Sequence, residues 1–271
     1  MADASFEGVY NFRDVGAAIN ALNTAPILQE KMIYRSGRLD GATEGDRRKL
    51  VEQYNLQTVV DLRTKSEHIR QGTDKLALRP WKTVFINFVS HEFEINLLRQ
   101  LRWWQIIQFV LLMLLRFRIS AIRILGQNVL KRKGLIGLSR DSLRFCQAEI
   151  LAALNVFILP MHTCPVLVHC TQGKDRSGLV IMLVLFVLSV PLQHIKAEYS
   201  MSELGLAPVR KSLIGEVEEI GMDEAYTRAP EEVVQAVWDC LETEYGGVDR
   251  YLDLLGFHEE KRRTLRKILL V

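Results

Sequence analysis

The chain has 271 residues, of which 35 are Lys or Arg and 32 are Asp or Glu, giving a net charge of +3. So small an excess of positive charge argues against a nucleic-acid partner and does not by itself predict a membrane one. The hydrophobic content of 48% is ample for a core, and the length predicts a single domain over residues 1–271.

The amino terminus and the cysteine content bear on the compartment. The first residues lack the basic start and the apolar run of a signal peptide. Four cysteines in a chain of this length do not make a disulfide framework, which favours a reducing compartment. We therefore expect a cytoplasmic protein, and the sequence leaves its oligomeric state open.

Strands and helices alternate through the first third of the chain. Runs of β-branched and aromatic residues predict strands at 31–34, 56–62 and 83–88. A threonine with the chemistry of a helix cap opens the first of two expected helices, at 43–54 and 66–71.

Helical patterns dominate the remainder of the chain. A segment rich in Leu, Ile and Arg predicts a helical insertion over about 92–157. The apolar run 165–169 predicts a short buried strand, and the longer run 178–190 predicts a buried helix. The helices expected in the carboxyl-terminal tail are 193–204, 209–220, 230–245, 247–255 and 258–270.

This order of elements indicates the fold class. Strands that alternate with helices favour an α/β fold with a small, mostly parallel sheet flanked by helices. The insertion at about 92–157 and the helical tail would then cap that sheet.

Two apolar stretches resemble membrane spans but are too short. Trp103 to Leu115 and Leu179 to Val190 both fall below the roughly 20 residues that cross a bilayer. We expect the second to be a fully buried helix and the first to pack in the core or as a lid. A membrane-touching face is the alternative for the apolar and Arg-rich segment 97–123, so peripheral membrane contact stays open.

A polar loop joins the strand 165–169 to the helix that follows. The amino end of that helix presents unpaired N–H groups and positive dipole, which together make an anion site. Gly173 lets the backbone amides of Thr171, Gln172 and their neighbours turn inward. Arg176 adds a planar fork for two phosphate oxygens. Lys174 is expected to add a charge at the rim, either as a further phosphate-binding residue or as a solvated charge.

Cys170 is the first residue of this loop. The amides and cations that bind a phosphate also stabilise a thiolate, and a thiolate aimed at a phosphate monoester is a nucleophile. Ser177 can donate a hydrogen bond to the sulfur as it leaves the phosphorus. A buried structural cysteine is the plainer alternative, but Arg176 six residues later favours the nucleophile.

The spacing His-Cys-x5-Arg-Ser is the signature of the protein-tyrosine-phosphatase superfamily. Within it, the chain resembles the bacterial and fungal tyrosine and phosphoinositide phosphatases of the "tyrosine phosphatase family 3" type. The segments that carry the resemblance are HCTQGKDRSG (169–178), NFRDVG (11–16), YRSG (34–37), DLR (61–63) with Glu67, and YGGVDRYLDLLGF (245–257). Ala17 stands where members usually have Gly, and Ser177 where they usually have Thr.

Two aspartates compete for the role of general acid. Classical superfamily members carry this acid on a WPD loop, and the nearest segment here, 79–82, lacks the acid. Asp175 lies in the loop itself, where a phosphate dianion disfavours its charged form, as suits an acid. Asp61 is the second candidate because it ends a strand at the edge where such sheets place their sites.

The remaining polar residues near the motifs are expected to support the loop. His169 would orient Cys170 by hydrogen bonds to the loop backbone. Asp14, Arg13, Arg35 and Arg63 are interpreted as one set of ion pairs behind the loop. A buried structural role is favoured for Cys164, with a resolving thiol for oxidised Cys170 as the alternative.

The predicted function is hydrolysis of phosphate monoesters through a phosphocysteine, with Cys170, Arg176, Asp175 and Ser177 as catalytic residues. This mechanism needs neither a metal nor a cofactor. The resemblance implies phosphotyrosine and phosphoinositides as substrates. The alternatives are a phosphate-binding pseudophosphatase that acts as an interaction module and, less well matched to the Arg spacing, a rhodanese-like sulfur carrier.

Overall fold

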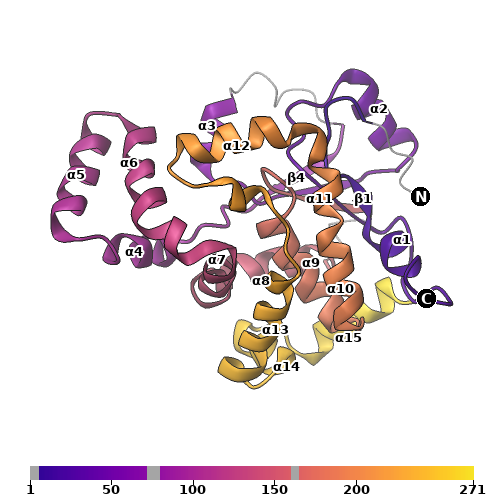
Figure 1. The fold of residues 1–271 in the computed structure, drawn as a ribbon. Helices are drawn as coiled ribbons and strands as arrows, with labels where there is room; N and C mark the ends of the chain where they lie inside the picture. The colour runs from indigo at the N-terminus through magenta and orange to yellow at the C-terminus, as the bar shows by residue number, and fades with distance from the viewer. Residues whose placement is uncertain (1–5, 72–79, 160–164) are drawn as a thin grey trace.

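The computed structural model describes residues 6–71, 80–159 and 165–271 and contains one five-stranded sheet among helices (Figure 1). The strands are β1 (Arg13–Asp14), β2 (Ile33–Ser36), β3 (Thr58–Asp61), β4 (Lys82–Phe85) and β5 (Val166–His169). Their order across the sheet is β1-β2-β5-β3-β4. Only β1 pairs in antiparallel fashion, so the predicted α/β class with a mostly parallel sheet is confirmed.

The register of the sheet brings three loops to one edge. Ser36 at the end of β2 and Asp61 at the end of β3 are both level with His169 at the end of β5. Because these strands are parallel, the loops that follow them leave the sheet side by side. The predicted site is therefore assembled from three separate parts of the chain.

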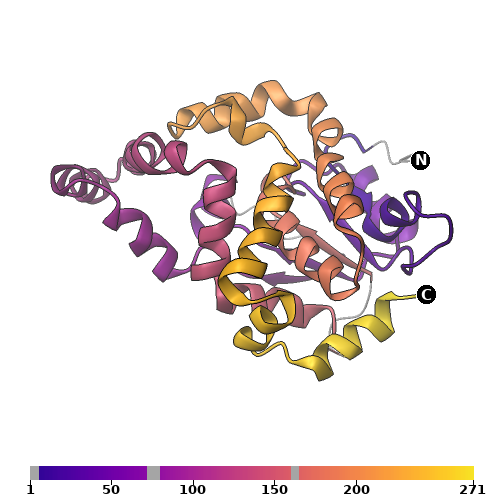
Figure 2. The same cartoon turned by 60° about the horizontal axis from the view of Figure 1, so that its bottom comes forward.

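Helices cover both faces of the sheet (Figures 1 and 2). On one face, Val60, Val166 and Val168 join a large core built around α9 (Asp175–Val187). On the other face, Val59 and Leu167 join a smaller cluster beneath α2 (Glu44–Glu52). Strands β2, β3 and β5 are thus buried on both sides, as near-continuous apolar strands predict, whereas the edge strand β4 is partly exposed.

The central helix α9 is buried along nearly its whole length, from Ser177 to Val187. This burial confirms the buried helix expected over 178–190, although the helix begins three residues earlier. Its amino end directly follows the loop after β5, and its carboxyl end leads toward α10 (Leu192–Ser200).

The helical insertion is present and the helical tail follows as predicted. The insertion comprises α4 (His91–Arg99), α5 (Trp103–Leu114), α6 (Arg118–Leu125), a π-helical turn (Gly126–Leu130), α7 (Lys131–Phe145) and α8 (Gln147–Val156). The tail comprises α10 (Leu192–Ser200), α11 (Ser202–Gly205), α12 (Arg210–Glu219), α13 (Glu232–Tyr245), α14 (Val248–Leu255) and α15 (Glu259–Leu269), with short 3-10 turns at Ala207–Val209 and Glu224–Thr227. Two further helices, α1 (Val15–Asn20) and α3 (Lys65–Gln71), flank the sheet.

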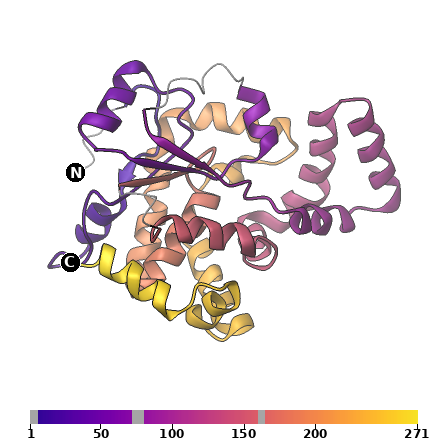
Figure 3. The same cartoon turned by 180° about the vertical axis from the view of Figure 1, so that it is seen from behind.

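Helices α5 and α6 form a hairpin that stands away from the body of the protein (Figures 1 and 3). Trp103 and Leu114 on this hairpin are 75% and 76% exposed. The expectation that Trp103 to Leu115 packs in the core is therefore wrong, because most of its large apolar side chains are exposed, and the alternative of a lid stays a prediction. In the described parts of the chain, no helix is both long and apolar enough to cross a bilayer.

Candidate active site

The loop between β5 and α9 depends on a glycine. Gly173 has a φ of +67°, a left-handed backbone that side chains disfavour. A Cβ at this position would lie 2.0 Å from the carbonyl oxygen of Ser36. The loop therefore packs directly against the end of β2, and only glycine permits both the turn and the close approach.

The carbonyl groups of the loop all point away from its centre. The backbone amide of Arg38 donates to Thr171 O (3.0 Å), and Asn11 Nδ2 donates to Gln172 O (3.0 Å) and Gly173 O (3.1 Å). The Arg35 guanidinium donates to the carbonyls of residues 173 and 174.

The amides of the same loop lack such partners. Among the described residues, no acceptor is found for the backbone N–H groups of residues 171–177. Carbonyls turned outward and amides without acceptors together form a cradle for an anion at the amino end of α9. The sequence analysis places its expected phosphate site at the same loop.

Cys170 lies at the base of this cradle, 2% exposed. Its Sγ is 3.6 Å from Ser177 Oγ, within reach of a hydrogen bond to sulfur. His169 is fully buried behind it, with Nδ1 3.3 Å from Cys170 O and Nε2 3.4 Å from an oxygen of Asp61. The structure thus brings together the thiol, the hydroxyl and the supporting imidazole that the sequence singles out.

Arg176 is held by Glu67 of α3. Nη1 and Nη2 of Arg176 donate to the two carboxylate oxygens of Glu67 at 2.7 and 2.6 Å, and Nη1 also donates to Leu62 O. Burial alone would raise the pKa of Glu67, but the charge and hydrogen bonds of Arg176 outweigh it and hold that pKa well below its usual range. Thr171 Oγ1 also donates to Glu67, so one carboxylate fixes both the arginine and the loop.

Lys174 does not lie at the rim. Its side chain is fully buried, and Nζ donates to Asp175 Oδ1 at 2.7 Å. The expectation of a rim charge is therefore wrong, since the backbone at Lys174 turns its side chain inward. The carboxylate of Asp175 is 41% exposed and remains accessible beside Arg176.

Asp61 is placed poorly for acid catalysis. It is fully buried, and its two oxygens accept from Nε and Nη2 of Arg63 at 2.9 and 2.7 Å. Burial would raise the pKa of Asp61, but the charge of His169 and the hydrogen bonds of Arg63 and His169 lower it well below its usual range. Asp61 is therefore a buried carboxylate whose two oxygens are both held by Arg63.

The ion pairs behind the loop differ from the predicted set. Asp14 instead caps α1, accepting from the amides of Ala17 (3.2 Å) and Lys31 (2.6 Å). Arg63 pairs separately with Asp40 and Asp61. The expectation of a single cluster of Asp14, Arg13, Arg35 and Arg63 is therefore wrong.

The acid that pairs with the two remaining arginines was missed. Glu198 of α10 is 1% exposed and binds Arg13 Nε at 2.8 Å and Arg35 Nη1 at 2.7 Å. The signal was indirect: two arginines in or beside buried strands require a buried acid, but no motif says which one. Asn11 donates to two loop carbonyls and belongs to the segment NFRDVG, but the motif alone does not predict this contact.

Tyr199, next to Glu198, is a second residue that the sequence does not single out. Its ring packs against Gly178 of α9, where an added Cβ would lie 3.1 Å away. Its hydroxyl is buried and has no hydrogen-bond partner among the described residues. Burial raises the pKa of Tyr199 well above its ordinary value, and the negative charge of Asp175 raises it further, so the hydroxyl stays a donor.

Two of the sequence-based hypotheses concern residues whose structure is not described. Cys164, considered as a resolving thiol, and Arg79, in the segment nearest to a WPD loop, both lie outside the described ranges. In the ranges that are described, no group of three His, Cys, Asp or Glu side chains is arranged to hold a metal ion.

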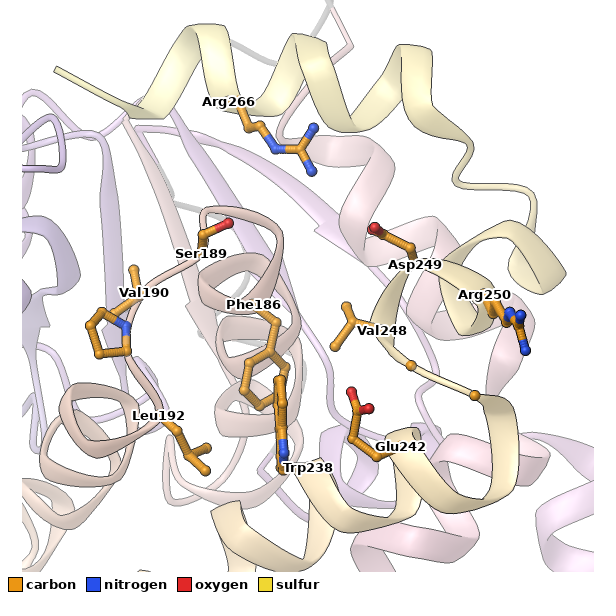
Figure 4. Close-up of a pocket in the computed structure, with 13 residues that line it drawn as sticks. Phe186, Ser189, Val190, Leu192, Trp238, Glu242, Val248, Asp249, Arg250 and Arg266 are labelled. Carbon is orange, nitrogen blue, oxygen red and sulfur yellow. The ribbon is translucent and has the colours of Figure 1, made fainter.

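A pocket of about 680 Å³ lies elsewhere, at the carboxyl end of α9 (Figure 4). It contains the ring pair Phe186 and Trp238, whose centroids are 5.2 Å apart, together with Glu242 and Arg266. Because α9 has 13 residues, roughly 20 Å of helix separates this pocket from the loop. None of the predicted site residues lines this cavity.

Comparison with a curated protein gives a partial match. A tyrosine-protein phosphatase from Nostoc commune is 31% identical over 110 residues. The matched part is 37% of this chain and 37% of that protein, so the similarity spans little more than a third of the relative's length.

A comparison with families covers far more of the chain. The family model described as "Tyrosine phosphatase family" matches residues 4–271. This range takes in the sheet, the Cys170 loop, the insertion and the helical tail. The chain therefore belongs to the tyrosine phosphatase family.

Proposed function

We propose that this protein is a phosphatase that hydrolyses phosphate monoesters through a phosphocysteine intermediate. The observation that carries the proposal is the position of Cys170 Sγ at the base of a cradle of inward-facing amides, beside Ser177 and Arg176. A bound phosphoryl group would provide the acceptors that these amides lack among the described residues. Membership of the tyrosine phosphatase family supports the same activity.

In the first step, the thiolate of Cys170 attacks phosphorus in line with the leaving oxygen. An S–P bond forms while the P–O bond breaks, and the leaving oxygen takes a proton from Asp175. The amides and the guanidinium of Arg176 hold the three equatorial oxygens, where charge is spread in a loose transition state.

In the second step, water attacks the phosphocysteine and the S–P bond breaks. Asp175, now a carboxylate, accepts a proton from this water. Ser177 Oγ, 3.6 Å from the sulfur, donates a hydrogen bond that stabilises the departing thiolate. Inorganic phosphate is the product, and the enzyme returns to its starting state.

Asp175 is proposed as the general acid on the basis of its position. Its carboxylate is 41% exposed, whereas the competing Asp61 is fully buried and bound on both oxygens by Arg63. Lys174 Nζ donates to Asp175 Oδ1 at 2.7 Å and so restrains the orientation of this carboxylate.

The proposed substrates are phosphotyrosine and phosphoinositides. The name of the Nostoc commune relative and the family description favour phosphotyrosine as the first to test. Phosphoinositides rest on the resemblance of the loop sequence to enzymes that act on both classes. Because Lys174 is buried against Asp175, we expect Lys174→Ala to impair both substrates, and not phosphoinositides alone.

The test is a substrate panel run with the wild-type protein and with Cys170→Ser. We expect the wild type to release phosphate from p-nitrophenyl phosphate, a phosphotyrosine peptide and at least one phosphoinositide. Cys170→Ser should lower kcat by about a thousandfold or more while tungstate still binds, because the amides and Arg176 remain. Substantial residual turnover would remove Cys170 from the role of nucleophile.

The same panel separates the alternative function. A pseudophosphatase would bind phosphotyrosine peptide or tungstate but release no phosphate, even in a single turnover at high enzyme concentration. The presence of Cys170, Arg176 and Ser177 in one loop favours the active enzyme.

We further propose a single domain in the cytoplasm. The proposal is supported by one sheet shared by both halves of the chain and by the free thiols of Cys146, Cys170 and Cys240. Limited proteolysis and cell fractionation test its two parts.

A further inference from the structure

The outer side of the α5–α6 hairpin is the most apolar exposed surface that the structure describes. Ten of the exposed large hydrophobic side chains lie between residues 103 and 119. On α5 they recur with the spacing of one helix face. We define the hairpin face by six of them: Trp103, Trp104, Ile107, Leu111, Leu114 and Phe117.

Packing inside the hairpin does not account for this face. The inner side of α5 includes Gln105, which is 6% exposed and donates to Asn128 at 2.8 Å. Ile106 and Phe109 add partly buried contacts on the same side. The polar residue is thus inside and the largest apolar residues are outside, the reverse of what folding in water favours. An exposed apolar surface of this extent marks an interaction site.

Charge indicates what the hairpin face meets. Residues 95–140 contain nine Lys and Arg and no Asp or Glu, although the whole chain is nearly neutral. Arg102, Arg116, Arg118 and Arg123 are exposed, and none has an acidic partner among the described residues. These four arginines lie at both ends of the hairpin face, so its apolar centre is bordered by unpaired positive charge.

The shape of the hairpin suits a flat surface. It projects from the body in each view, so nothing else in the described chain shields its outer side (Figures 1, 2 and 3). Helix α5 has 12 residues, about 18 Å of helix, which is too short to cross a bilayer. Tryptophan, phenylalanine and arginine are the residues that amphipathic helices place at the boundary between lipid headgroups and acyl chains.

We propose that the hairpin face binds the surface of a membrane that contains anionic phospholipids. The apolar side chains enter the interface, and Arg102, Arg116 and Arg118 contact the negatively charged headgroups. A second copy of the chain fits less well, because positive charge at both ends of the face brings like charges together in either orientation of a symmetric pair.

Sedimentation of the full chain with vesicles tests this proposal. We expect binding to vesicles of phosphatidylcholine with phosphatidylserine, much weaker binding to phosphatidylcholine alone, and release at high salt. Phosphatidylserine carries no phosphate monoester, so it does not occupy the proposed catalytic loop. The result is therefore independent of whether the protein is a phosphatase.

Two pairs of variants locate the binding surface. Trp103→Ser with Leu114→Ser should weaken vesicle binding about tenfold or more, since both side chains are largely exposed and their loss leaves the fold intact. The matched control is Leu204→Ser with Leu254→Ser, which are 82% and 63% exposed on other helices.

The charge pair is Arg116→Gln with Arg118→Gln, which should reduce binding to anionic vesicles and its salt dependence. Its control is Lys211→Gln with Lys267→Gln, which also removes two positive charges, from exposed positions outside the hairpin. This control should bind vesicles as the wild type does. Circular dichroism establishes that each variant is folded.

Three outcomes would overturn the proposal. One is no binding of the wild type to anionic vesicles. Another is equal loss of binding in the hairpin variants and their controls. The third is a dimer in light scattering that Trp103→Ser with Leu114→Ser converts to a monomer without any vesicle binding, which would give the face to a second copy.

Discussion

At the scale of single residues, the position of Arg176 is decided by a carboxylate far away in sequence. Glu67 engages both terminal nitrogens of the guanidinium and also accepts from Thr171. A free arginine side chain samples many rotamers, and fixing it before substrate arrives lowers the entropic cost of reaching the transition state. Glu67 is thus expected to act on the reaction without touching the substrate.

Glu67→Gln tests this expectation. The amide keeps one acceptor but turns a donor toward the guanidinium, so Arg176 loses its two-point contact. We expect kcat/KM for p-nitrophenyl phosphate to fall about 10- to 100-fold, as for other misplaced catalytic groups. Glu44→Gln, which removes an exposed ion pair with Arg48, is the control and should leave kcat/KM unchanged. Wild-type kcat/KM in Glu67→Gln would show that Arg176 needs no such support.

A second prediction at this scale concerns the leaving group. Asp175→Asn cannot donate a proton, so alkyl phosphates should lose far more rate than p-nitrophenyl phosphate, whose leaving group needs little protonation. The measurement is kcat/KM for both substrates with the wild type and the variant. An equal loss on the two substrates would assign the proton to another group.

At the scale of elements, the loop and the strand beside it form one unit. Asn11 from the amino-terminal segment and Arg35 from β2 bind the loop carbonyls, and the loop backbone at Gly173 packs on Ser36. The amides face inward because their carbonyls are tied outward. The geometry of the cradle of loop amides therefore depends on β2 and its neighbours as much as on the loop sequence.

Gly173→Ala tests that unit. The substitution places a methyl group 2.0 Å from Ser36 O and forces a side chain into the left-handed region, at a cost of about 1–3 kcal/mol or more. We expect a lower Tm and loss of tungstate binding. Gly215→Ala is the control, since its Cβ would meet nothing within 4 Å and lies on helix α12, where alanine is favoured. Retained tungstate affinity in Gly173→Ala would mean that the cradle does not depend on this turn.

The sequence predicts the local parts of this site and misses the distant ones. Cys170, Ser177 and Arg176 are close in sequence, and a strand, a glycine turn and a helix fix their relation, so their spacing suffices. The pairing of Arg13 and Arg35 with Glu198 joins segments that only the tertiary fold brings together. The rim position predicted for Lys174 is wrong for a similar reason. A buried lysine needs a partner, and the sequence pattern alone does not show which way a loop side chain turns.

The helices and strands also divide into those that a local sequence pattern predicts and those that it does not. The buried helix α9 and the strands β3 and β5 follow from continuous apolar runs, whereas the two-residue β1 is too short to leave a pattern. The exposed α5 is predicted as a helix but not as exposed, because apolar periodicity reports a face and not what covers it.

At the scale of the whole molecule, three carboxylates pair with arginines around the sheet. Asp61 of β3 pairs with Arg63, Glu67 of α3 pairs with Arg176, and Glu198 of α10 pairs with Arg13 and Arg35. For each of these acids burial acts to raise the pKa, and the paired arginines or His169 lower it below the ordinary value. All three therefore stay charged in the folded state to a lower pH than in the unfolded state.

These lowered pKa values predict a protein that is sensitive to acid. A carboxyl group whose folded pKa is depressed contributes stability that is present above its unfolded pKa, near 3.9 for Asp and 4.3 for Glu, and is lost as the pH falls below it. The unfolded chain then binds more protons than the folded one, so Tm should be level near neutral pH and fall steeply below about pH 5.

Glu198→Gln separates the contribution of one carboxylate from the rest. It leaves two buried arginines without their counter-charge, so we expect about 3–5 kcal/mol of destabilisation at pH 7. Because the group that titrates is gone, the variant should lose less Tm than the wild type between pH 6 and pH 4. Thermal melts followed by circular dichroism at both pH values, with Glu44→Gln as the exposed control, measure this difference. If the wild type and Glu198→Gln lose the same Tm between pH 6 and pH 4, the acid sensitivity comes from other groups, because the variant has no carboxyl group at position 198 to take up a proton.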